Sequence, residues 1–426
     1  MSSPSAHEGR KTELASSCRG LTRAPEHHLR PSPAQVRVAY LVTHPIQYQA
    51  PLLRRIAREP GIYLRVFFAS DVSLGAFRDC GFNTTIEWDV PLLDAYDYEF
   101  LPALGGIRRV SMLRPFSVGL GKRLRQGNFD ALWVHGYSRP HHWAAMLTAR
   151  RMGLKMLLRD EATAIGNPRG AARRMAKRAF FAWLRRTVDA FLAIGTLNRR
   201  YYQNYGIGAE RIFSMPYAVD NRLFQARVRQ AAPHREELRQ SLRLEPGRPV
   251  ILFVGKLIER KRPGDLLQAY AQMVQSGAGA APYLLYIGDG QLGPQLQRRA
   301  AALRLDTVRF LGFRNQSELP AFYELCDVFV MPTVYEPWGL VVNEVMNAAR
   351  PVVISDAVGC APDLVEDGVN GLVYRACDVD DLRRALEQIL ADPQRLVRMG
   401  EQSLARINRW SFEEDVCGLR AALGMG

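Results

Sequence analysis

The sequence lacks three features that would each point to a particular class of protein. No apolar run approaches the ~18 to 20 residues that a membrane-spanning helix requires, so we expect no transmembrane segment. The six cysteines form no CxxC pair and no His-Cys metal spacing, which argues against a disulfide-stapled fold and favours reduced thiols in a cytosolic setting. The first half has no GxGxxG motif, which disfavours a dinucleotide site there.

The length and composition are those of a globular protein with more than one domain. Its 426 residues are roughly three times the usual ~150-residue domain, and 47% hydrophobic with 23% charged residues is an ordinary balance. Residues 1–35 differ, because they are rich in Ser, Pro, His and Arg and show no periodic apolar pattern. We predict a disordered tail over 1–35 and folded domains after it.

Positive charge is concentrated in the first half of the chain. Lys and Arg outnumber Asp and Glu by 57 to 42, which gives a net charge of +15. Residues 1–225 hold 33 basic and 17 acidic residues, whereas residues 226–426 hold 24 and 25. Such one-sided basicity suits an anionic partner such as nucleic acid, an acidic lipid surface or a phosphorylated substrate; solubility alone is the simpler alternative.

From Val36 onward, short apolar runs alternate with segments of 3.6-residue periodicity, which is typical of β-α units around parallel sheets. We therefore predict two Rossmann-like, doubly wound α/β domains over 36–225 and 226–405, facing each other across a cleft at the carboxyl ends of their strands. The expected strands are 36–42, 64–68, 131–135, 155–158, 190–194 and 212–215 in the first domain, and 250–254, 283–287, 308–311, 328–331 and 352–355 in the second.

The segment Glu336-Pro-Trp-Gly-Leu-Val-Val-Asn-Glu344 follows one of these strands and a turn. A helix that starts near Gly339 would present free backbone N–H groups to hydroxyl or phosphate oxygens in the cleft. A carboxylate inside that helix can accept hydrogen bonds from the two vicinal hydroxyls of a ribose. Taken alone, however, two glutamates at a helix start are more often simply solvated.

These residues resemble the E-x7-E signature of retaining family-4 glycosyltransferases (glycosyl transferases group 1), which have the two-domain GT-B fold. The similarity continues through 348–353, 359–365 and 367–373. This family has its other donor loops at the positions that correspond here to 254–257 with Lys261, to 288–290 and to 310–313. The stretch 43–48, THPIQY, resembles the first loop of surface-polysaccharide glycosyltransferases, and 406–426 resembles the helix that crosses back to the N-terminal domain.

The resemblance implies a donor site for a nucleotide-diphosphate sugar in the second domain. Glu344 takes the position of the residue that binds the nucleotide ribose, and Glu336 that of the residue near the donor sugar. Lys256 stands where the family commonly has Arg. It keeps the positive charge for the diphosphate, but it lacks the planar guanidinium group that can donate two parallel hydrogen bonds. The expected donor-binding residues are Lys256, Lys261, Gly288, Gly312, Glu336, Trp338, Gly339, Leu340 and Glu344, and the candidate catalytic residues are His135, Lys256, Lys261 and Glu336.

The acceptor side is expected on the first domain. His44 and Gln47 belong to the THPIQY loop, and His135 ends a strand where the family has a histidine that touches the donor hexose. Asp160 and Glu161 follow the next strand, so either could hold acceptor hydroxyls. The alternatives are a structural role for His135, and a salt bridge to Arg159 or a helix cap for the two carboxylates.

Residues 169–186, from Arg169 to Arg186, contain seven basic residues and no acidic one, together with Phe180, Phe181, Trp183 and Leu184. Helical spacing puts Lys177, Phe181 and Arg185 on one stripe, so we expect an aromatic ring within the basic face. Such a helix suits the interface of an anionic membrane. A surface helix that packs its apolar side on the sheet is the alternative.

We therefore expect an enzyme that transfers a sugar with retention to a lipid-linked or surface-polysaccharide glycan. It would need no cofactor and no metal, because Lys256 and Lys261 already meet the diphosphate charge. We expect a cytoplasmic protein, peripheral on the inner face of the plasma membrane. A GT-B-fold nucleotide-sugar isomerase or glycan phosphorylase is the alternative, and nucleic-acid binding is disfavoured because no recognition module is present.

Overall fold

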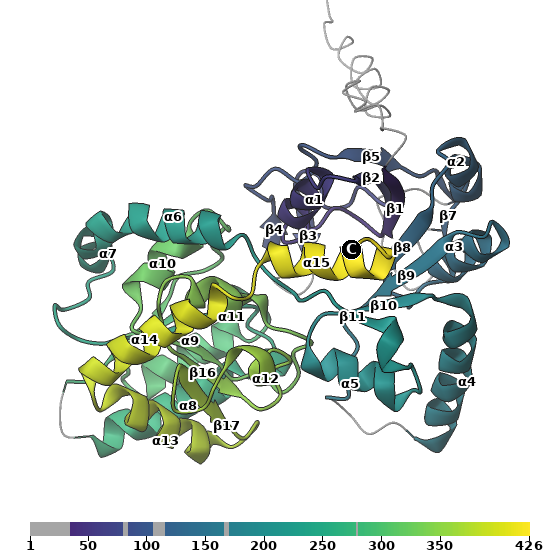
Figure 1. Ribbon diagram of the computed structural model, residues 1–426. Coiled ribbons are helices and arrows are strands. Elements are labelled where there is room, and N and C mark those ends of the chain that lie inside the picture. The colour runs from purple at the N-terminus through teal and green to yellow at the C-terminus, as the bar shows by residue number, and fades with distance from the viewer. Residues whose placement is uncertain (1–34, 80–83, 105–115, 166–169, 278–279) are drawn as a thin grey trace, which may run out of the picture.

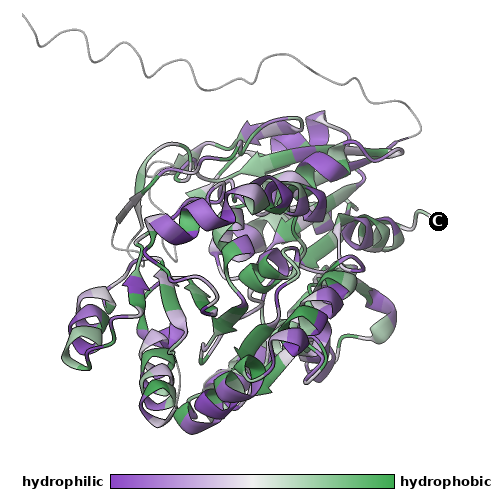
Figure 2. Cartoon of the chain, turned by 90° about the vertical axis from the view of Figure 1, so that its left-hand side faces the viewer, coloured by the Kyte–Doolittle hydropathy of each residue, from purple (hydrophilic) through white to green (hydrophobic). Residues whose placement is uncertain are grey.

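The computed structural model describes residues 35–79, 84–104, 116–165, 170–277 and 280–426, so the predicted tail lies almost wholly outside the described residues. The chain forms two lobes, each built on one parallel sheet (Figure 1). The predicted fold class, two Rossmann-like α/β domains, is confirmed. Figure 2 shows hydrophobic strands inside each lobe and helices of mixed character around them.

The first lobe contains a seven-stranded sheet in which every pairing is parallel. Its strands were predicted to within two residues, except for the edge strand β5, which the sequence pattern did not reveal. In sheet order, the strands are β11 (Ile212–Ser214), β10 (Ala190–Ala193), β9 (Lys155–Arg159), β8 (Ala131–His135), β1 (Val36–Val42), β2 (Ile62–Phe68) and β5 (Asp97–Phe100).

Helices cover both faces of this sheet, because side chains on each strand alternate between the two faces. One face packs against α2, α3, α4 and α5, and the other against α1 and α15. Two short antiparallel pairs, β3–β4 and β6–β7, lie outside the sheet. The bounds are α1 (Ala50–Ala57), α2 (Leu120–Gln126), α3 (Pro140–Arg151), α4 (Ala171–Thr187), α5 (Thr196–Asn204), α15 (Phe412–Leu423), β3 (Phe77–Asp79), β4 (Thr84–Ile86), β6 (Ala103–Leu104) and β7 (Phe116–Ser117).

The second lobe contains a six-stranded parallel sheet. Its central strands are continuous runs of apolar residues, as expected for strands that are buried on both faces. β17 was not predicted as a strand. In sheet order, the strands are β14 (Val308–Phe310), β13 (Tyr283–Ile287), β12 (Val250–Val254), β15 (Val328–Met331), β16 (Val352–Ser355) and β17 (Gly371–Tyr374).

Helices on the second lobe again form two layers. One layer, with α6, α10, α11 and α12, encloses one hydrophobic cluster, and α8, α9 and α13 enclose the other, while α14 contributes to both. The predicted boundary between residues 225 and 226 falls within α6, and the domain limits themselves stay a prediction. The bounds are α6 (Asn221–Ala231), α7 (Arg235–Ser241), α8 (Pro263–Ser276), α9 (Gly293–Ala302), α10 (Leu319–Leu325), α11 (Leu340–Met346), α12 (Ala361–Leu364), α13 (Val379–Leu390) and α14 (Pro393–Ile407).

The C-terminal helix α15 returns from the second lobe to the sheet of the first (Figure 1). Gly418 makes this packing possible, because a Cβ atom there would lie 1.7 Å from the Ser214 carbonyl oxygen of β11. A buried ion pair adds to the contact, since Arg159 Nη2 donates to Asp415 Oδ1 at 3.0 Å. The last helix is thus fixed to the strand whose carboxyl end leads into Asp160 and Glu161.

Candidate active site

The loop that begins at Glu336 is held by close backbone packing. Gly339 caps the seven-residue helix α11 in a left-handed conformation, with φ at 102°. A Cβ atom at Gly359 would lie 1.9 Å from the Pro337 carbonyl oxygen, so only glycine permits this approach. The helix starts at Leu340, which agrees with the predicted start near Gly339. The loop therefore presents Glu336 and Trp338 from a rigid turn after β15.

Glu336 forms an ion pair with Lys261, through Nζ and Oε2, although 75 residues separate them in the chain. Arg260 Nη1 lies 3.5 Å from the same carboxylate oxygen. Both side chains of the Lys261–Glu336 pair are only 15% exposed. The interpretation of Glu336 as a solvated surface residue is therefore wrong. Lys256 stands at the start of the same loop after β12, next to Gly255.

Glu344 is buried within α11, with 8% of its surface exposed. The Tyr323 hydroxyl donates to Glu344 Oε2 at 2.5 Å. Burial raises the pKa of Glu344 from 4.5 to about 7, because the charged form loses its hydration, and the bond from Tyr323 only partly offsets this. Neither glutamate of the pair is solvated.

Three glycine-containing loops meet beside these residues. A Cβ atom at Gly288 would lie 2.0 Å from the Gly255 carbonyl oxygen, and one at Gly290 would lie 2.6 Å from that of Leu257. The Gly288 N–H donates to the Gly312 carbonyl oxygen at 2.8 Å. These contacts join the loops after β12, β13 and β14. Gly288 and Gly312 thus position the loop that carries Lys256 and Lys261. The GxGxxG pattern over 288–293 is the sequence signal for this packing, and our sequence-based prediction did not use it.

On the first lobe, His135 lies in a buried hydrogen-bond network at the carboxyl end of β8. The Tyr40 hydroxyl is 3.0 Å from its Nδ1, and Gln49 Nε2 is 3.2 Å from its Nε2. Burial, and then the charge of Arg159, lower its pKa to about 3. The imidazole is therefore neutral at physiological pH, and it can exchange hydrogen bonds without carrying charge.

Glu161 is bound by two tyrosines from distant parts of the chain. The Tyr217 hydroxyl donates to its Oε1 at 2.5 Å, and the Tyr48 hydroxyl donates to the same atom at 3.2 Å. Tyr217 also links the lobes, because its carbonyl oxygen accepts from Asn343 Nδ2 at 3.1 Å and from Trp410 Nε1 at 2.9 Å. The sequence reading missed Tyr217, which follows Pro216 at the end of the first sheet.

Trp338 belongs to the same junction. Its indole N–H donates to Asn343 Oδ1 at 2.9 Å, and its ring stacks on Trp410 with centroids 5.5 Å apart. A Cβ atom at Gly195, in the first lobe, would lie 2.3 Å from the Trp338 ring. Nearby, Asp363 accepts from the Thr196 backbone N–H at 2.9 Å. The lobes are therefore in direct contact beside the Glu336 loop.

Asp160 turns into the first lobe, unlike Glu161. Its two oxygens accept from the Ala162 N–H at 2.5 Å and from the Tyr202 hydroxyl at 3.0 Å. Burial raises its pKa to about 6. A salt bridge from Arg159 to either neighbouring carboxylate was one expectation, and it is wrong, because Arg159 pairs with Asp415.

The THPIQY loop lies between β1 and α1. Arg139 Nη1 donates to Thr43 Oγ1 at 3.1 Å, which joins this loop to the start of α3. Burial and the neighbouring Arg139 charge lower the pKa of His44 to about 4. Gln47 is partly exposed on the same loop. His44 and His135 thus lie at the carboxyl ends of adjacent strands, β1 and β8.

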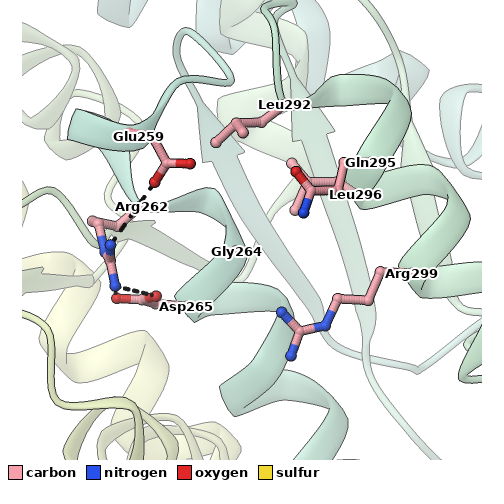
Figure 3. Close-up of a pocket in the computed structure, with 8 residues that line it drawn as sticks. All are labelled: Glu259, Arg262, Gly264, Asp265, Leu292, Gln295, Leu296 and Arg299. Atoms are coloured by element: carbon pink, nitrogen blue, oxygen red, sulfur yellow. Dashed lines mark hydrogen bonds and ion pairs between the residues drawn. The ribbon is translucent and has the colours of Figure 1, made fainter.

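A surface pocket of about 180 Å³ lies elsewhere, between the loop of Lys261 and helices α8 and α9 (Figure 3). Two arginines line it, Arg262 and Arg299. The Asp265 carboxylate binds Arg262 through two contacts of 2.8 Å, and Arg299 Nη2 donates to Gln268 Oε1 at 3.2 Å. The lining residues do not include Lys261, Glu336 or Glu344. Asp378 and Asp380 form an Asp-x-Asp triplet in the second lobe, and Asp378 caps α13 by accepting from the Asp381 N–H.

Within the described ranges, no helix is long and apolar enough to cross a membrane. In the same part of the chain, no three His, Cys, Asp or Glu side chains gather in a way that could hold a metal ion.

Comparison with solved structures identifies the fold as GT-B. The chain superimposes on sucrose-phosphate synthase from Thermosynechococcus elongatus with a TM-score of 0.70 and 18% identity, over 92% of this chain and 98% of that one. It superimposes on the Anabaena protein HepE in complex with UDP and glucose with a TM-score of 0.66 and 18% identity, over 92% and 100%.

Comparison of sequences adds a family match for the second lobe, beyond the likeness in fold. Residues 234–406 match the family model of glycosyl transferases group 1. D-inositol 3-phosphate glycosyltransferase of Nocardia farcinica is 32% identical over 228 residues, 52% of this chain and 49% of that protein. Alpha-D-kanosaminyltransferase of Streptomyces kanamyceticus is 30% identical over 196 residues, 46% and 49%. The chain thus spans about half the length of the curated relatives it matches.

Proposed function

We propose that this protein is a retaining glycosyltransferase of family 4. It would transfer a sugar from a nucleotide-diphosphate donor to a lipid-linked or surface-polysaccharide glycan. The observation that carries the proposal is the presence of a buried Glu344 and a Lys261–Glu336 ion pair in the lobe that matches glycosyl transferases group 1.

Glu344 is the proposed ligand of the ribose. Its carboxylate is buried with a single hydroxyl donor, Tyr323, so it retains acceptor capacity for the two hydroxyls of a ribose. Those hydroxyls would compensate part of the hydration that burial removes. Their binding favours the charged carboxylate and lowers the raised pKa.

Lys261 and Lys256 are proposed to bind the diphosphate. In the absence of ligand, Lys261 pairs with Glu336; a diphosphate would take over part of this interaction and leave Glu336 to face the sugar. Positive charge at this point stabilises the negative charge that develops on the leaving diphosphate as the glycosidic bond breaks. In a reaction with retention, the acceptor oxygen attacks the oxocarbenium-like carbon from the side on which the diphosphate leaves.

The first lobe is proposed to supply the remaining contacts. Neutral His135 can bind a hydroxyl of the donor sugar, and Glu161, already bound by Tyr217 and Tyr48, can orient the acceptor. Arg139 and the net positive charge of this lobe favour an acceptor that carries phosphate. Solved HepE contains UDP and glucose, and this supports a nucleotide-sugar donor here.

The test is a binding panel of UDP-, GDP-, ADP- and dTDP-sugars, measured by isothermal titration. We expect one donor to bind the intact protein and to bind Glu344→Gln and Lys261→Met much more weakly. Glu401→Gln, an exposed glutamate on α14, is the matched control and should bind normally. Absence of binding by every donor, or equal binding by all variants, would reject the donor site.

Activity assays separate the transferase from the alternative activities. A glycan phosphorylase would release sugar phosphate when a glycan and inorganic phosphate are supplied, and an isomerase would convert the nucleotide sugar with no acceptor present. A transferase does neither, and its product, analysed by NMR, keeps the anomeric configuration of the donor sugar.

A further inference from the structure

The first lobe carries three consecutive helices on one side, α2, α3 and α4 (Figure 1). Figure 1 shows them along the edge of this lobe that faces away from the second lobe. Their sequences contain no acidic residue and eleven basic ones, Lys122, Arg123, Arg125, Arg150, Arg151, Arg173, Arg174, Lys177, Arg178, Arg185 and Arg186. Part of the excess positive charge of residues 1–225 therefore lies on these three helices.

The structure corrects the expected arrangement of α4. Phe181 does not lie in the basic face, because its side chain is fully buried and packs against Tyr205. Lys177 is turned toward the lobe as well, where its Nζ donates to the Tyr137 hydroxyl at 2.7 Å. The core side of the helix is therefore formed by Phe181 and Leu184. Arg169 lies outside the described residues.

A different set of apolar side chains reaches the surface. The Trp143 ring on α3 contacts Phe180 on α4 at 5.8 Å between centroids, and Phe180 contacts Trp183 at 5.4 Å. Trp143 is 41% exposed, and Leu147, one turn further along α3, is 39% exposed. Met175, three residues before Arg178 on α4, is 72% exposed but lies on another side of this helix. We call Trp143, Leu147, Phe180 and Trp183 the α3–α4 apolar patch.

Exposed arginines cover other parts of the surface of α4. All residues of 171–176, the first turns of α4, are exposed, and so are Arg178, Arg185 and Arg186. Tryptophan and arginine next to each other are typical of surfaces that lie in the headgroup region of a bilayer, where the ring enters the acyl boundary and the cation meets phosphate.

We propose that the α3–α4 apolar patch, Met175 and the exposed arginines of α4 dock the protein on an anionic lipid bilayer. Arg123 on α2 pairs with Glu99 and Arg150 on α3 pairs with Asp189, so the charge argument rests on α4. This helix carries six basic residues and no acidic one, and charge complementarity therefore favours an anionic surface as the occupant. The position of the patch agrees with this proposal. The Trp143 indole N–H donates to the Tyr137 carbonyl oxygen at 2.7 Å, and Tyr137 lies two residues after His135. The patch thus begins beside the loop that follows His135, which we propose to bind the donor sugar.

The test is sedimentation of the full-length protein with lipid vesicles. Vesicles of phosphatidylglycerol and phosphatidylcholine should bind the protein, and vesicles of phosphatidylcholine alone should bind it much more weakly. A basic residue near an anionic surface contributes about 1 kcal/mol, so the double variant Arg173→Glu/Arg178→Glu should lower the partition coefficient at least about 30-fold. Met175→Asp should weaken binding by blocking insertion, although it removes no positive charge.

A matched control changes the same net charge elsewhere. Arg298→Glu/Arg409→Glu alters two exposed arginines of the second lobe and should retain vesicle binding. All variants should melt at the temperature of the intact protein and bind the nucleotide sugar normally, which separates this proposal from the proposed catalytic function. Equal binding to both kinds of vesicle, no binding at all, or equal loss in both double variants would overturn the proposal. Binding of duplex DNA in place of vesicles, lost in Arg173→Glu/Arg178→Glu, would identify a nucleic-acid surface and would also overturn it.

Discussion

Replacing Glu344 by Gln should stabilise the protein without ligand while it removes donor binding. Burial raises the pKa of Glu344 from 4.5 to about 7. The folded protein therefore favours the protonated carboxyl, and its contribution to stability is complete below pH 4.5 and is lost as the pH rises through about 7. At pH 8 the buried carboxylate costs the folded state on the order of 3 kcal/mol, since one pKa unit corresponds to about 1.36 kcal/mol.

Glutamine keeps the shape of the side chain and an oxygen that can accept from the Tyr323 hydroxyl, but it carries no charge to bury. In a domain of 150 to 250 residues, 1 kcal/mol shifts Tm by roughly 2 to 4 °C, so we expect Glu344→Gln to melt roughly 6 to 12 °C higher at pH 8. At pH 4.5 the difference should disappear. Buried Asp160 and Asp415 titrate in both proteins, so the comparison isolates Glu344.

The assay is differential scanning calorimetry of both proteins from pH 4.5 to pH 8, with exposed Glu401→Gln as the control. The reasoning would be refuted by a Glu344→Gln variant that melts no higher than the intact protein at pH 8. A Tm difference that does not change with pH would refute it too, because the stabilisation would then not come from titration of this carboxyl.

Further predictions concern the rest of the site and the contact between the lobes. Lys261→Met should weaken diphosphate binding at least tenfold in isothermal titration, because it removes a charge-assisted contact; affinity within threefold of the intact protein would contradict this. Gly418→Ala places a Cβ atom against the Ser214 carbonyl oxygen and should lower the free energy of unfolding by about 2 kcal/mol or more, measured by urea denaturation. Tyr217→Phe removes the bond to Glu161 and should slow transfer about tenfold or more while donor affinity stays the same, measured by steady-state kinetics. Unchanged turnover would show that this bond has no role in the reaction.

The sequence pattern predicted most of the fold because the inner strands of both sheets are buried on both faces. Runs such as 250–254 and 283–287 are continuous apolar segments, and their bounds agree with β12 and β13. β5 was missed because this edge strand, Asp97–Phe100, is short and half polar. β17 was missed because it begins at Gly371 within a glycine-containing turn region.

The candidate site was predictable only in part. The spacing of Glu336 and Glu344 is local, so one loop and one helix determine it. Their partners are not local: Lys261 and Tyr323 come from other β-α units, and packing of the sheet decides which groups meet. The same holds for Tyr217, whose contact with Glu161 spans 56 residues.

The sequence pattern led us to place Phe181 on the basic face of α4, and this error has a related cause. Helical periodicity shows which residues share a stripe, but it does not show which stripe faces the sheet when several carry aromatic rings. In α4 the stripe with Phe181 and Leu184 packs inward, and the stripe with Trp183 stays partly exposed.

The most direct test of the donor site is a binding cycle with the nucleoside diphosphate that binds best and its 2′,3′-dideoxy analogue, each titrated into the intact protein and Glu344→Gln. Two hydrogen bonds from ribose hydroxyls to a buried carboxylate correspond to about 3 kcal/mol or more. The intact protein should therefore lose at least about 100-fold in affinity for the analogue, and Glu344→Gln should bind both nucleotides with similar, weak affinity. If the variant discriminates between the two nucleotides as strongly as the intact protein does, Glu344 does not bind the ribose and the proposed donor site is wrong.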